Sequence, residues 1–325
     1  MGELRRPSTR ALLTALRETL PSAGLRAAVR TVQREENVFA SSHPSEVVRC
    51  TLESGEALTL LCKIGPSRDQ DRWGLVRGLQ YEAAVYREVL TEQDPTPRFY
   101  GSWEDPQSGM TWLFLEYLGE GWQLDLGPET AIVDAAAAIG RLHREGLQQG
   151  RSVSVLNRYD ARYYQRCLSE SVPRLARWQQ RLPAIEPIAV RFEQEFEVLL
   201  SAPQTIVHGE FTPHNVVWAQ ERPYVIDWEE AAIGAGEIDL ACLTDDWDAD
   251  LVDQATAAYV AARWPDGPPH DFRRALQAAR LYWMFRWLAD ADADEGDGAQ
   301  DVAWMMDRFS ERARDTPLRL SPDRL

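Results

Sequence analysis

The local sequence pattern changes at Gly119-Glu120-Gly121, and this change restricts the fold more than any other feature of the chain. Before it, short runs of β-branched and aromatic residues alternate with turn residues, which is typical of antiparallel strands. After it, apolar residues recur at the three- and four-residue intervals of helices. The chain of 325 residues is long enough for two such units. We therefore predict an α+β fold of two lobes, residues 1–118 and 119–325, joined at a hinge.

The first lobe is predicted to contain a small five-stranded antiparallel sheet and two helices. The helices are expected over residues 8–30 and 75–90. Turn residues such as Ser-Ser-His-Pro and Glu-Ser-Gly-Glu separate the β-branched runs and so limit the strands. The expected strands are residues 29–33, 46–52, 58–64, 98–103 and 111–118.

The second lobe is predicted to be mainly helical, with one short hairpin. The hairpin strands, residues 216–218 and 224–226, follow a short buried strand at residues 206–207. The turn Gln220-Glu221-Arg222-Pro223 separates the two hairpin strands. Helices are expected over residues 128–145, 160–200 with a break near Pro183, 249–263, 271–289 and 300–313.

Three polar side chains, Glu210, Asn215 and Asp227, border the predicted hairpin. Antiparallel pairing brings the two ends of a hairpin together, so these side chains are expected to converge. Asn and Asp supply the oxygen ligands that Mg²⁺ prefers, and substrate phosphates can complete its shell. A nearby carboxylate can orient and deprotonate an attacking hydroxyl. The alternative is three unrelated polar residues on an exposed hairpin; the combined spacing favours magnesium-assisted phosphoryl transfer.

A lysine and a glutamate in the first lobe form a second candidate pair. Lys63 lies inside the apolar run of the third predicted strand, where a charge needs a partner or a ligand. Glu82 is the charged member of the inward face of the following predicted helix. Phosphoryl-transfer enzymes use such a pair to hold nucleotide phosphates. The alternative is that both side chains are solvated.

The residues His208-Gly209-Glu210-Phe211-Thr212-Pro213-His214-Asn215 and Ile226-Asp227-Trp228-Glu229 resemble the signature of a known family. It is the aminoglycoside phosphotransferase and choline kinase family, small-molecule relatives of the protein kinases. The resemblance implies a bilobal protein-kinase-like fold, ATP or another nucleoside triphosphate as the phosphoryl donor and Mg²⁺ as the metal. It also implies a hydroxyl on a small molecule as the acceptor.

The same resemblance implies roles for individual residues. Asn215 and Asp227 would be the magnesium ligands, and position 210 the catalytic carboxylate. Lys63 and Glu82 would hold the phosphates, and backbone groups near Glu116 to Leu118 would bind adenine. Two further residues would be structural: His208 would brace the catalytic loop, and Asp239 would hydrogen-bond to the backbone of that loop.

The chain departs from the family pattern at two places. Position 210 is glutamate where the family has aspartate, and the turn over residues 39–45 has no glycine for a phosphate-binding loop. Three accounts of Glu210 are open: it still reaches the acceptor hydroxyl, it contacts metal instead, or activity is weak or lost. The last account would make the chain a nucleotide-binding pseudokinase acting through partners. Because Lys63, Glu82, Asn215 and Asp227 are all present, we favour an active enzyme.

Composition excludes several other classes of protein. No apolar run reaches the roughly 20 residues needed to span a bilayer, and the N-terminus lacks a secretory apolar core. The formal net charge of −16 repels phosphate backbones, so we expect no nucleic-acid partner. The four cysteines are far apart and form no C-x-x-C pair, which argues against a zinc site or a disulfide framework. We expect a cytoplasmic protein without a membrane partner.

The acceptor is expected to bind between the catalytic loop and the C-terminal helices. Acidic residues in this region favour an amine-bearing acceptor such as an aminoglycoside, although choline, a sugar, a macrolide or a biosynthetic intermediate remains open. These residues are Glu229, Glu230, Asp245, Asp246, Asp248 and Asp250.

Histidines and tryptophans outside the motif give weaker signals. His143 lies on an apolar helix face and is expected to be packed and hydrogen-bonded, whereas His214 could equally face a substrate or solvent. Most of the tryptophans are expected in the core, although one or two could wall a substrate pocket. These are Trp178, Trp247, Trp264, Trp283 and Trp287.

Overall fold

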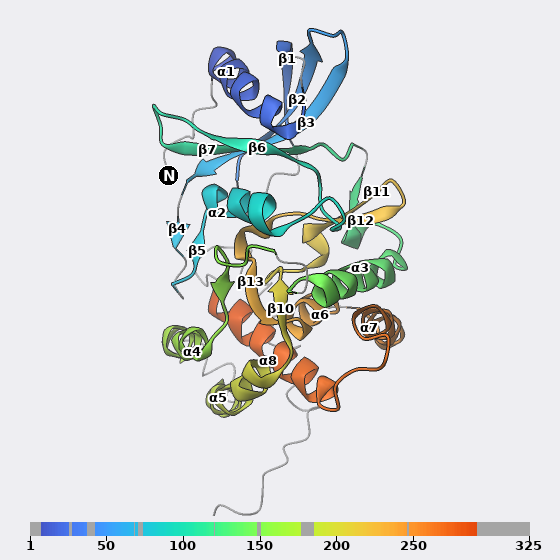
Figure 1. Ribbon diagram of the computed structural model, residues 1–325. Coiled ribbons are helices and arrows are strands. Elements are labelled where there is room, and N and C mark those ends of the chain that lie inside the picture. Colours follow the sequence, from blue (N-terminus) through green and yellow to red (C-terminus); the bar gives the residue numbers. More distant parts are fainter. Residues whose placement is uncertain are drawn as a thin grey trace, which may run out of the picture.

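A computed structural model describes residues 8–25, 28–37, 43–67, 69–70, 74–119, 121–147, 151–176, 185–245 and 247–290 (Figure 1). The helix expected at residues 300–313, Asp246, Trp178 and most of the expected phosphate-binding turn lie outside these residues. Within them, a lobe built on a β-sheet lies against a mainly helical lobe. We call these the sheet lobe and the helical lobe; the boundary at residue 118 stays a prediction.

The sheet lobe contains the predicted five-stranded antiparallel sheet. Each strand pairs with its neighbour in antiparallel register, and the third strand lies at the centre. In order across the sheet, the strands are β1 (Val29–Glu36), β2 (Ser45–Leu52), β3 (Ala57–Pro66), β7 (Met110–Glu116) and β6 (Phe99–Glu104).

The opening helix, α1, spans Thr9–Thr19 and is shorter than predicted. Its first turn is capped by Ser8, whose Oγ accepts a hydrogen bond from the amide of Ala11 at 3.2 Å. A 3-10 turn (Leu20–Ala23) follows. Gly24 then has a left-handed φ of +83°, which ends the helical segment. The prediction of helix as far as residue 30 was wrong because apolar periodicity outweighed these stop signals.

The two faces of the sheet pack against different partners. Trp112 and Phe114 of β7 belong to the core shared with α1, whereas the intervening Leu113 belongs to the core shared with the helical lobe. The same alternation applies on β3, where Cys62 packs on the α1 side. Lys63 therefore faces the other side of the sheet, toward the helical lobe.

The helix that carries Glu82 begins later than predicted. Residues Val76–Arg77 form a short strand, β5, paired with β4 (Asp69–Gln70), and α2 spans only Leu79–Ala84. The segment Val85–Val89 continues it as a π-helical turn. In Figure 1, α2 lies between the sheet and the helical lobe, so its buried face is held from both sides.

The helical lobe matches the predicted pattern closely at α7 and α8. The predicted break near Pro183 separates α4 from α5, and the residues between these helices lie outside the described chain. Prediction missed the short helix α6. The helices are α3 (Ala131–Glu145), α4 (Ala161–Ala176), α5 (Ile185–Ser201), α6 (Glu237–Leu243), α7 (Ala249–Arg263) and α8 (Phe272–Asp290).

Short strands in this lobe carry the loops that matter for function. The predicted hairpin is formed by β11 and β12, and β8 pairs with its free edge. The preceding strand, β10, pairs with β13, which prediction missed, and β9 adds to β13 in parallel. Their bounds are β8 (Trp122–Gln123), β9 (Asn157–Arg158), β10 (Gln204–Val207), β11 (Val216–Ala219), β12 (Arg222–Val225) and β13 (Ala232–Ala235).

Two global expectations can be compared with the described residues. All four cysteines are buried, and none of them is in a disulfide. Among the described residues, no helix combines the length and the apolar character that crossing a membrane requires. The α+β architecture, with its small sheet and larger helical part, is as predicted.

Candidate active site

The catalytic loop runs from His208 to Asn215, between β10 and β11. The buried ring of His208 links this loop to the residue that follows β12. Nε2 donates to the carbonyl of Ile226 at 2.8 Å, and Nδ1 accepts from the amide of Glu210 at 3.2 Å. Burial lowers the pKa of His208, which agrees with this neutral arrangement of one donor and one acceptor. His208 braces the loop, as predicted.

Asp239, in the first turn of α6, fixes the start of the loop. Its carboxylate accepts from the amides of His208 at 2.7 Å and Gly209 at 2.9 Å. His143 lies 3.1 Å from the same carboxylate through Nε2 and 2.9 Å from the hydroxyl of Tyr259 through Nδ1. The structural expectations for Asp239 and His143 are thus confirmed by these contacts.

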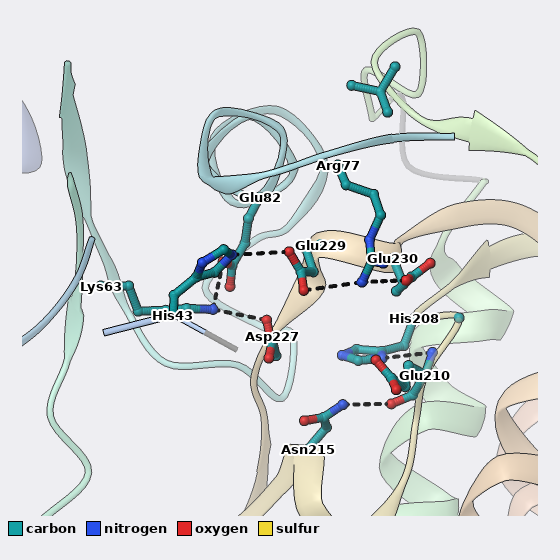
Figure 2. Close-up of polar contacts among 12 residues, drawn as sticks. His43, Lys63, Arg77, Glu82, His208, Glu210, Asn215, Asp227, Glu229 and Glu230 are labelled. Carbon is teal, nitrogen blue, oxygen red and sulfur yellow. Dashed lines mark hydrogen bonds and ion pairs between the residues drawn. The ribbon is translucent and has the colours of Figure 1, made fainter. Parts of the chain in front are cut away.

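The three motif side chains meet at the base of the hairpin (Figure 2). The side chain of Asn215 donates from Nδ2 to the main-chain carbonyl of Glu210 at 2.9 Å. The main-chain carbonyl of Asn215 accepts from the amide of Ile226 at 3.0 Å. Asp227, the next residue, has left-handed backbone angles of φ 66° and ψ 61°. Such a conformation costs about 1 to 3 kcal/mol outside glycine and is typical of functional sites.

The Glu210 side chain is held close to other carboxylates. Burial, together with the negative charges of Glu230 and Asp227, raises the pKa of Glu210 to about 7, against the opposing charges of Arg286 and Arg77. A carboxylate with such a pKa is a stronger base than an exposed one.

Lys63 lies between two carboxylates in the cleft. Its Nζ is 2.7 Å from Oε2 of Glu82 and 2.9 Å from Oδ1 of Asp227 (Figure 2). Burial alone would lower the pKa of Lys63, but the charges of Glu82 and Asp227 raise it on balance. Burial raises the pKa of Glu82 to about 7, although Lys63 opposes the shift. The structure therefore joins the predicted pair and adds Asp227 to it.

A cavity of about 330 Å³ lies between the two lobes, within the size range of small-molecule sites. Lys63 and Asp227 line it, as do the predicted hinge residues Glu116 and Leu118. The amide of Glu116 already donates to the carbonyl of Arg98, so this N–H is not available to a ligand. Apolar side chains contributed by both lobes complete the lining: Leu61, Val217 and Ile226.

The cavity also contains residues that the sequence reasoning missed. His43 and Asn37 approach it from the sheet lobe, and Trp122 lies where the chain enters the helical lobe. Trp122 is half-exposed. Its position just after the predicted hinge was the sequence signal that could have placed Trp122 in the lining of the cavity.

Two expected substrate-binding carboxylates have another role. Glu229 and Glu230 are buried, and both contact Nη2 of Arg77, at 3.2 Å and 2.5 Å respectively. Arg286 of α8 lies 2.8 Å from Glu230, and His43 lies 3.3 Å from Glu229 (Figure 2 shows His43). The expectation that these glutamates attract a cationic acceptor was wrong for this reason: they are already neutralised within the protein.

Arg77 and Arg286 were also missed. Arg286 continues the inward stripe of α8 formed by Ala275, Ala279 and Tyr282, so it is a charge on a buried helix face, as Glu82 is. The search for a charged residue on the apolar face of a predicted helix, which identified Glu82, would have identified Arg286 on α8. Arg77 offered no comparable signal because its position depends on a two-residue strand.

Other candidates make contacts outside the interlobe cavity. His214 is exposed and contacts Asp125 at 3.2 Å. Asp248 caps α7 by accepting from the amide of Leu251 at 3.0 Å. Trp283 is buried in the core, as expected.

The donor set suits a hard cation only in part. Among the described residues, no group of three or more His, Cys, Asp or Glu side chains could hold a metal ion. Asp227 lines the cavity, and Asn215 lies near it, so that both offer oxygen atoms as ligands (Figure 2). Such a two-residue set fits Mg²⁺, which commonly completes its shell with substrate phosphates and water.

The fold and this cleft define a bilobal, kinase-like phosphotransferase. A model of the phosphotransferase enzyme family matches residues 38–282, and the chain belongs to that family. The predicted family and the predicted enzyme class, a small-molecule phosphotransferase, are confirmed. The alternative of a silent pseudokinase is not supported.

Solved structures share the fold at low sequence identity. A choline kinase from Cryptosporidium parvum Iowa II is 13% identical over 95% of this chain and 96% of that chain, with a TM-score of 0.65. A putative aminoglycoside phosphotransferase from Ralstonia eutropha JMP134 is 16% identical over 95% and 99%, with a TM-score of 0.60. No curated protein sequence gives a significant match.

A third similar structure was solved with ligands. It is a thermostable mutant of the aminoglycoside phosphotransferase APH(4)-Ia in ternary complex with ADP and hygromycin B. It is 18% identical over 95% of this chain and 98% of that chain, with a TM-score of 0.57.

Proposed function

We propose that the protein transfers the γ-phosphoryl group of ATP to a hydroxyl of a small molecule, with Mg²⁺ bound at Asn215 and Asp227. One observation carries this proposal: Lys63, Glu82 and Asp227 form a connected ion-pair group on the wall of an interlobe cavity. Family membership sets the reaction class, and the connected group supplies a place for the phosphates.

The nucleotide would occupy the cavity between the lobes. Leu61 from the sheet lobe and Val217 from the helical lobe offer apolar surfaces for a flat base. The Leu118 end of the hinge supplies backbone groups for its edge, and Lys63 supplies a cation for the phosphates. The ADP bound to the similar APH(4)-Ia mutant supports this assignment.

Asn215 and Asp227 would hold the metal. The amide nitrogen of Asn215 is directed to Glu210, which leaves its oxygen as the ligand atom. The carboxylate of Asp227, which contacts Lys63 through Oδ1, would supply the second ligand. When bound, Mg²⁺ would neutralise charge on the phosphates.

Glu210 would act as the catalytic carboxylate. It would orient the acceptor hydroxyl and take its proton as the hydroxyl oxygen forms a bond to the γ-phosphorus. The bond from that phosphorus to the β–γ bridging oxygen breaks, and ADP leaves with the electron pair. Because such transfer depends mainly on positioning and charge, a glutamate can serve if the loop holds its longer side chain in place.

The acceptor would be an amine-bearing alcohol. The similar structures named as choline kinases and the hygromycin B complex support this class. Within the described chain, the exposed Asp250 stays as a candidate contact for an amine, since Glu229 and Glu230 are paired with Arg77 and Arg286.

The decisive experiment measures ADP release and product mass with a panel of hydroxylated amines, with and without Mg²⁺. We expect magnesium-dependent transfer to at least one acceptor, and loss of that transfer in Asp227→Asn. A matched control is Asp253→Asn, which changes a carboxylate on an exposed part of α7. Undiminished transfer in Asp227→Asn would show the proposed metal role to be wrong. A protein that binds no ATP and transfers to no acceptor would sink the proposal as a whole.

A further inference from the structure

A buried glutamate joins the two lobes next to the catalytic loop. Glu230 is 2% exposed, and its two carboxylate oxygens contact different arginines. Oε1 contacts Arg77, from β5 of the sheet lobe, and Oε2 contacts Arg286, from α8 of the helical lobe. The buried Glu230 and Arg286 would be costly without this arrangement, because a buried ion needs a close partner of opposite charge.

Arg286 also holds the catalytic loop directly. Its Nη1 donates to the carbonyl of Gly209 at 3.1 Å, while Nη2 lies 2.8 Å from Glu230. The amide of Gly209 is bound on its other side by Asp239. Both polar groups of the residue before Glu210 are therefore fixed by charged side chains, which restricts where the Glu210 side chain begins.

Close backbone packing strengthens this restriction. Gly209 has a φ of +86°, and a Cβ there would lie 2.5 Å from the carbonyl oxygen of Glu230. The loop thus lies directly against the segment that carries Glu230. The sheet lobe holds that segment at a second point, because Tyr81 of α2 donates to the carbonyl of Ala231.

We propose that Arg286 and Arg77 are positioning residues for phosphoryl transfer: Arg286 fixes the peptide between Gly209 and Glu210 directly, and Arg77 does so through Glu230. The proposal rests on the proposed role of Glu210. Arg286 sets the loop within the helical lobe, and Arg77 sets the same unit relative to the sheet lobe that holds the nucleotide. A longer carboxylate at position 210 makes such anchoring more important, since it has one more rotatable bond to control.

Arg286→Lys tests the direct anchor. Lysine keeps a cation beside Glu230 but lacks the second nitrogen that reaches the Gly209 carbonyl. We expect kcat to fall about 10- to 100-fold, as for a small misplacement of a reacting group, with little change in the KM for ATP. Amide exchange of the peptide covering residues 206–212 should become faster.

Arg151→Lys is the matched control. The side chain of Arg151 is 3% exposed, and it likewise joins a carboxylate, that of Asp94, to a backbone carbonyl. That carbonyl belongs to Val89, outside the catalytic loop. We expect a comparable loss of Tm in both variants but a loss of kcat only in Arg286→Lys. Equal loss of kcat in the two variants, or unchanged kcat in both, would overturn the proposal.

Arg77→Gln tests the link between the lobes. This substitution removes a partly exposed cation and leaves the buried cations of the core in place. The side chain of Arg77 is 28% exposed and does not line the nucleotide cavity. We expect kcat to fall with little change in the KM for ATP, and Arg77→Lys to restore most of the activity. Arg87→Gln, which removes a surface arginine bonded to Ser102, should behave like the wild type.

The exchange measurement separates this proposal from the proposed function, because it needs no turnover. If the wild type transfers no phosphoryl group, the proposed function fails, yet faster loop exchange in Arg286→Lys than in Arg151→Lys still supports the anchor. If the wild type is active and neither variant alters loop exchange or kcat, the anchor alone is wrong.

Discussion

At the scale of single residues, the surroundings of Glu210 set the basicity of the proposed catalytic carboxylate. Its carboxylate is one methylene longer than the aspartate of the family signature, and its pKa is raised to about 7 by burial and by Glu230. The backbone on either side is restrained, by His208 at its amide and by Asn215 at its carbonyl. The backbone of Glu210 is therefore restrained on both sides.

Replacing the Glu210 carboxylate by an amide should reduce turnover strongly. Glu210→Gln removes the proton acceptor with little change in size, and general-base catalysis contributes about 10²- to 10⁴-fold in rate. We expect kcat to fall within that range and the KM for ATP to stay nearly constant. Glu210→Asp should lose less, because it keeps a carboxylate.

Steady-state kinetics on purified variants measure this effect. Glu221→Gln provides the control, since Glu221 lies on the exposed turn of the β11–β12 hairpin. Full turnover in Glu210→Gln would exclude Glu210 as the base. Higher turnover in Glu210→Asp would show that the native glutamate limits the rate.

At the scale of elements, helices α3, α6 and α7 hold the catalytic loop through one buried polar chain. His143 of α3 contacts both Asp239 of α6 and Tyr259 of α7. Burial lowers the pKa of His143 below its ordinary value, although Asp239 opposes the shift. The folded protein therefore favours the neutral ring.

This lowered pKa makes the contribution of His143 to stability dependent on pH. The unfolded chain takes up a proton at His143 near its ordinary pKa of about 6.5, whereas the folded chain does so only at lower pH. The contribution is therefore complete above about pH 6.5 and is lost as the pH falls through the folded-state pKa.

Thermal melts between pH 8 and pH 5 of the wild type and His143→Gln should show this loss. We expect the wild type to have the higher Tm at pH 8, and the difference in Tm to narrow on acidification. His270→Gln, at an exposed position, is the control. A difference that stays constant or widens toward low pH would contradict the assignment of a neutral, stabilising His143.

At the scale of the whole molecule, the cavity between the lobes depends on both of them. Lys63, Glu116 and Leu61 come from the sheet lobe, whereas Val217 and Asp227 come from the helical lobe. A ligand that contacts both surfaces should stabilise their arrangement. Nucleotide binding between the lobes should therefore raise the free energy of unfolding of the whole protein.

Saturating ATP with Mg²⁺ should raise the Tm, since a ligand at 100 times its Kd adds about 2.7 kcal/mol to the free energy of unfolding. Lys63→Met, which removes the charge facing the phosphates, should lose most of this increase. Lys63 lines the cavity, so the test probes the proposed phosphate site directly. Equal ligand-induced increases in Tm in the variant and the wild type would exclude Lys63 as a phosphate-binding residue.

Residues with a strong local signal were predictable from sequence. Lys63 and Glu82 were found because a charge in an apolar pattern needs a partner, and α7 because its periodicity is regular from its first to its last residue. Arg77 and Glu230 depend instead on tertiary contacts between segments about 150 residues apart. No local pattern encodes such a pairing, so an acidic pair next to the motif was assigned to substrate rather than to the protein itself.

The ion pair between Lys63 and Asp227 has a consequence for the order in which ligands arrive. One oxygen of Asp227 lies 2.9 Å from the ammonium group of Lys63, which acts there as an internal counter-ion. A divalent cation arriving alone meets a carboxylate that is already neutralised. Under the proposed function, nucleotide phosphates would attract Lys63 away from Asp227 and thereby expose that carboxylate. Kinetic studies of ligand addition should therefore find that metal enters with the nucleotide or after it, and not before.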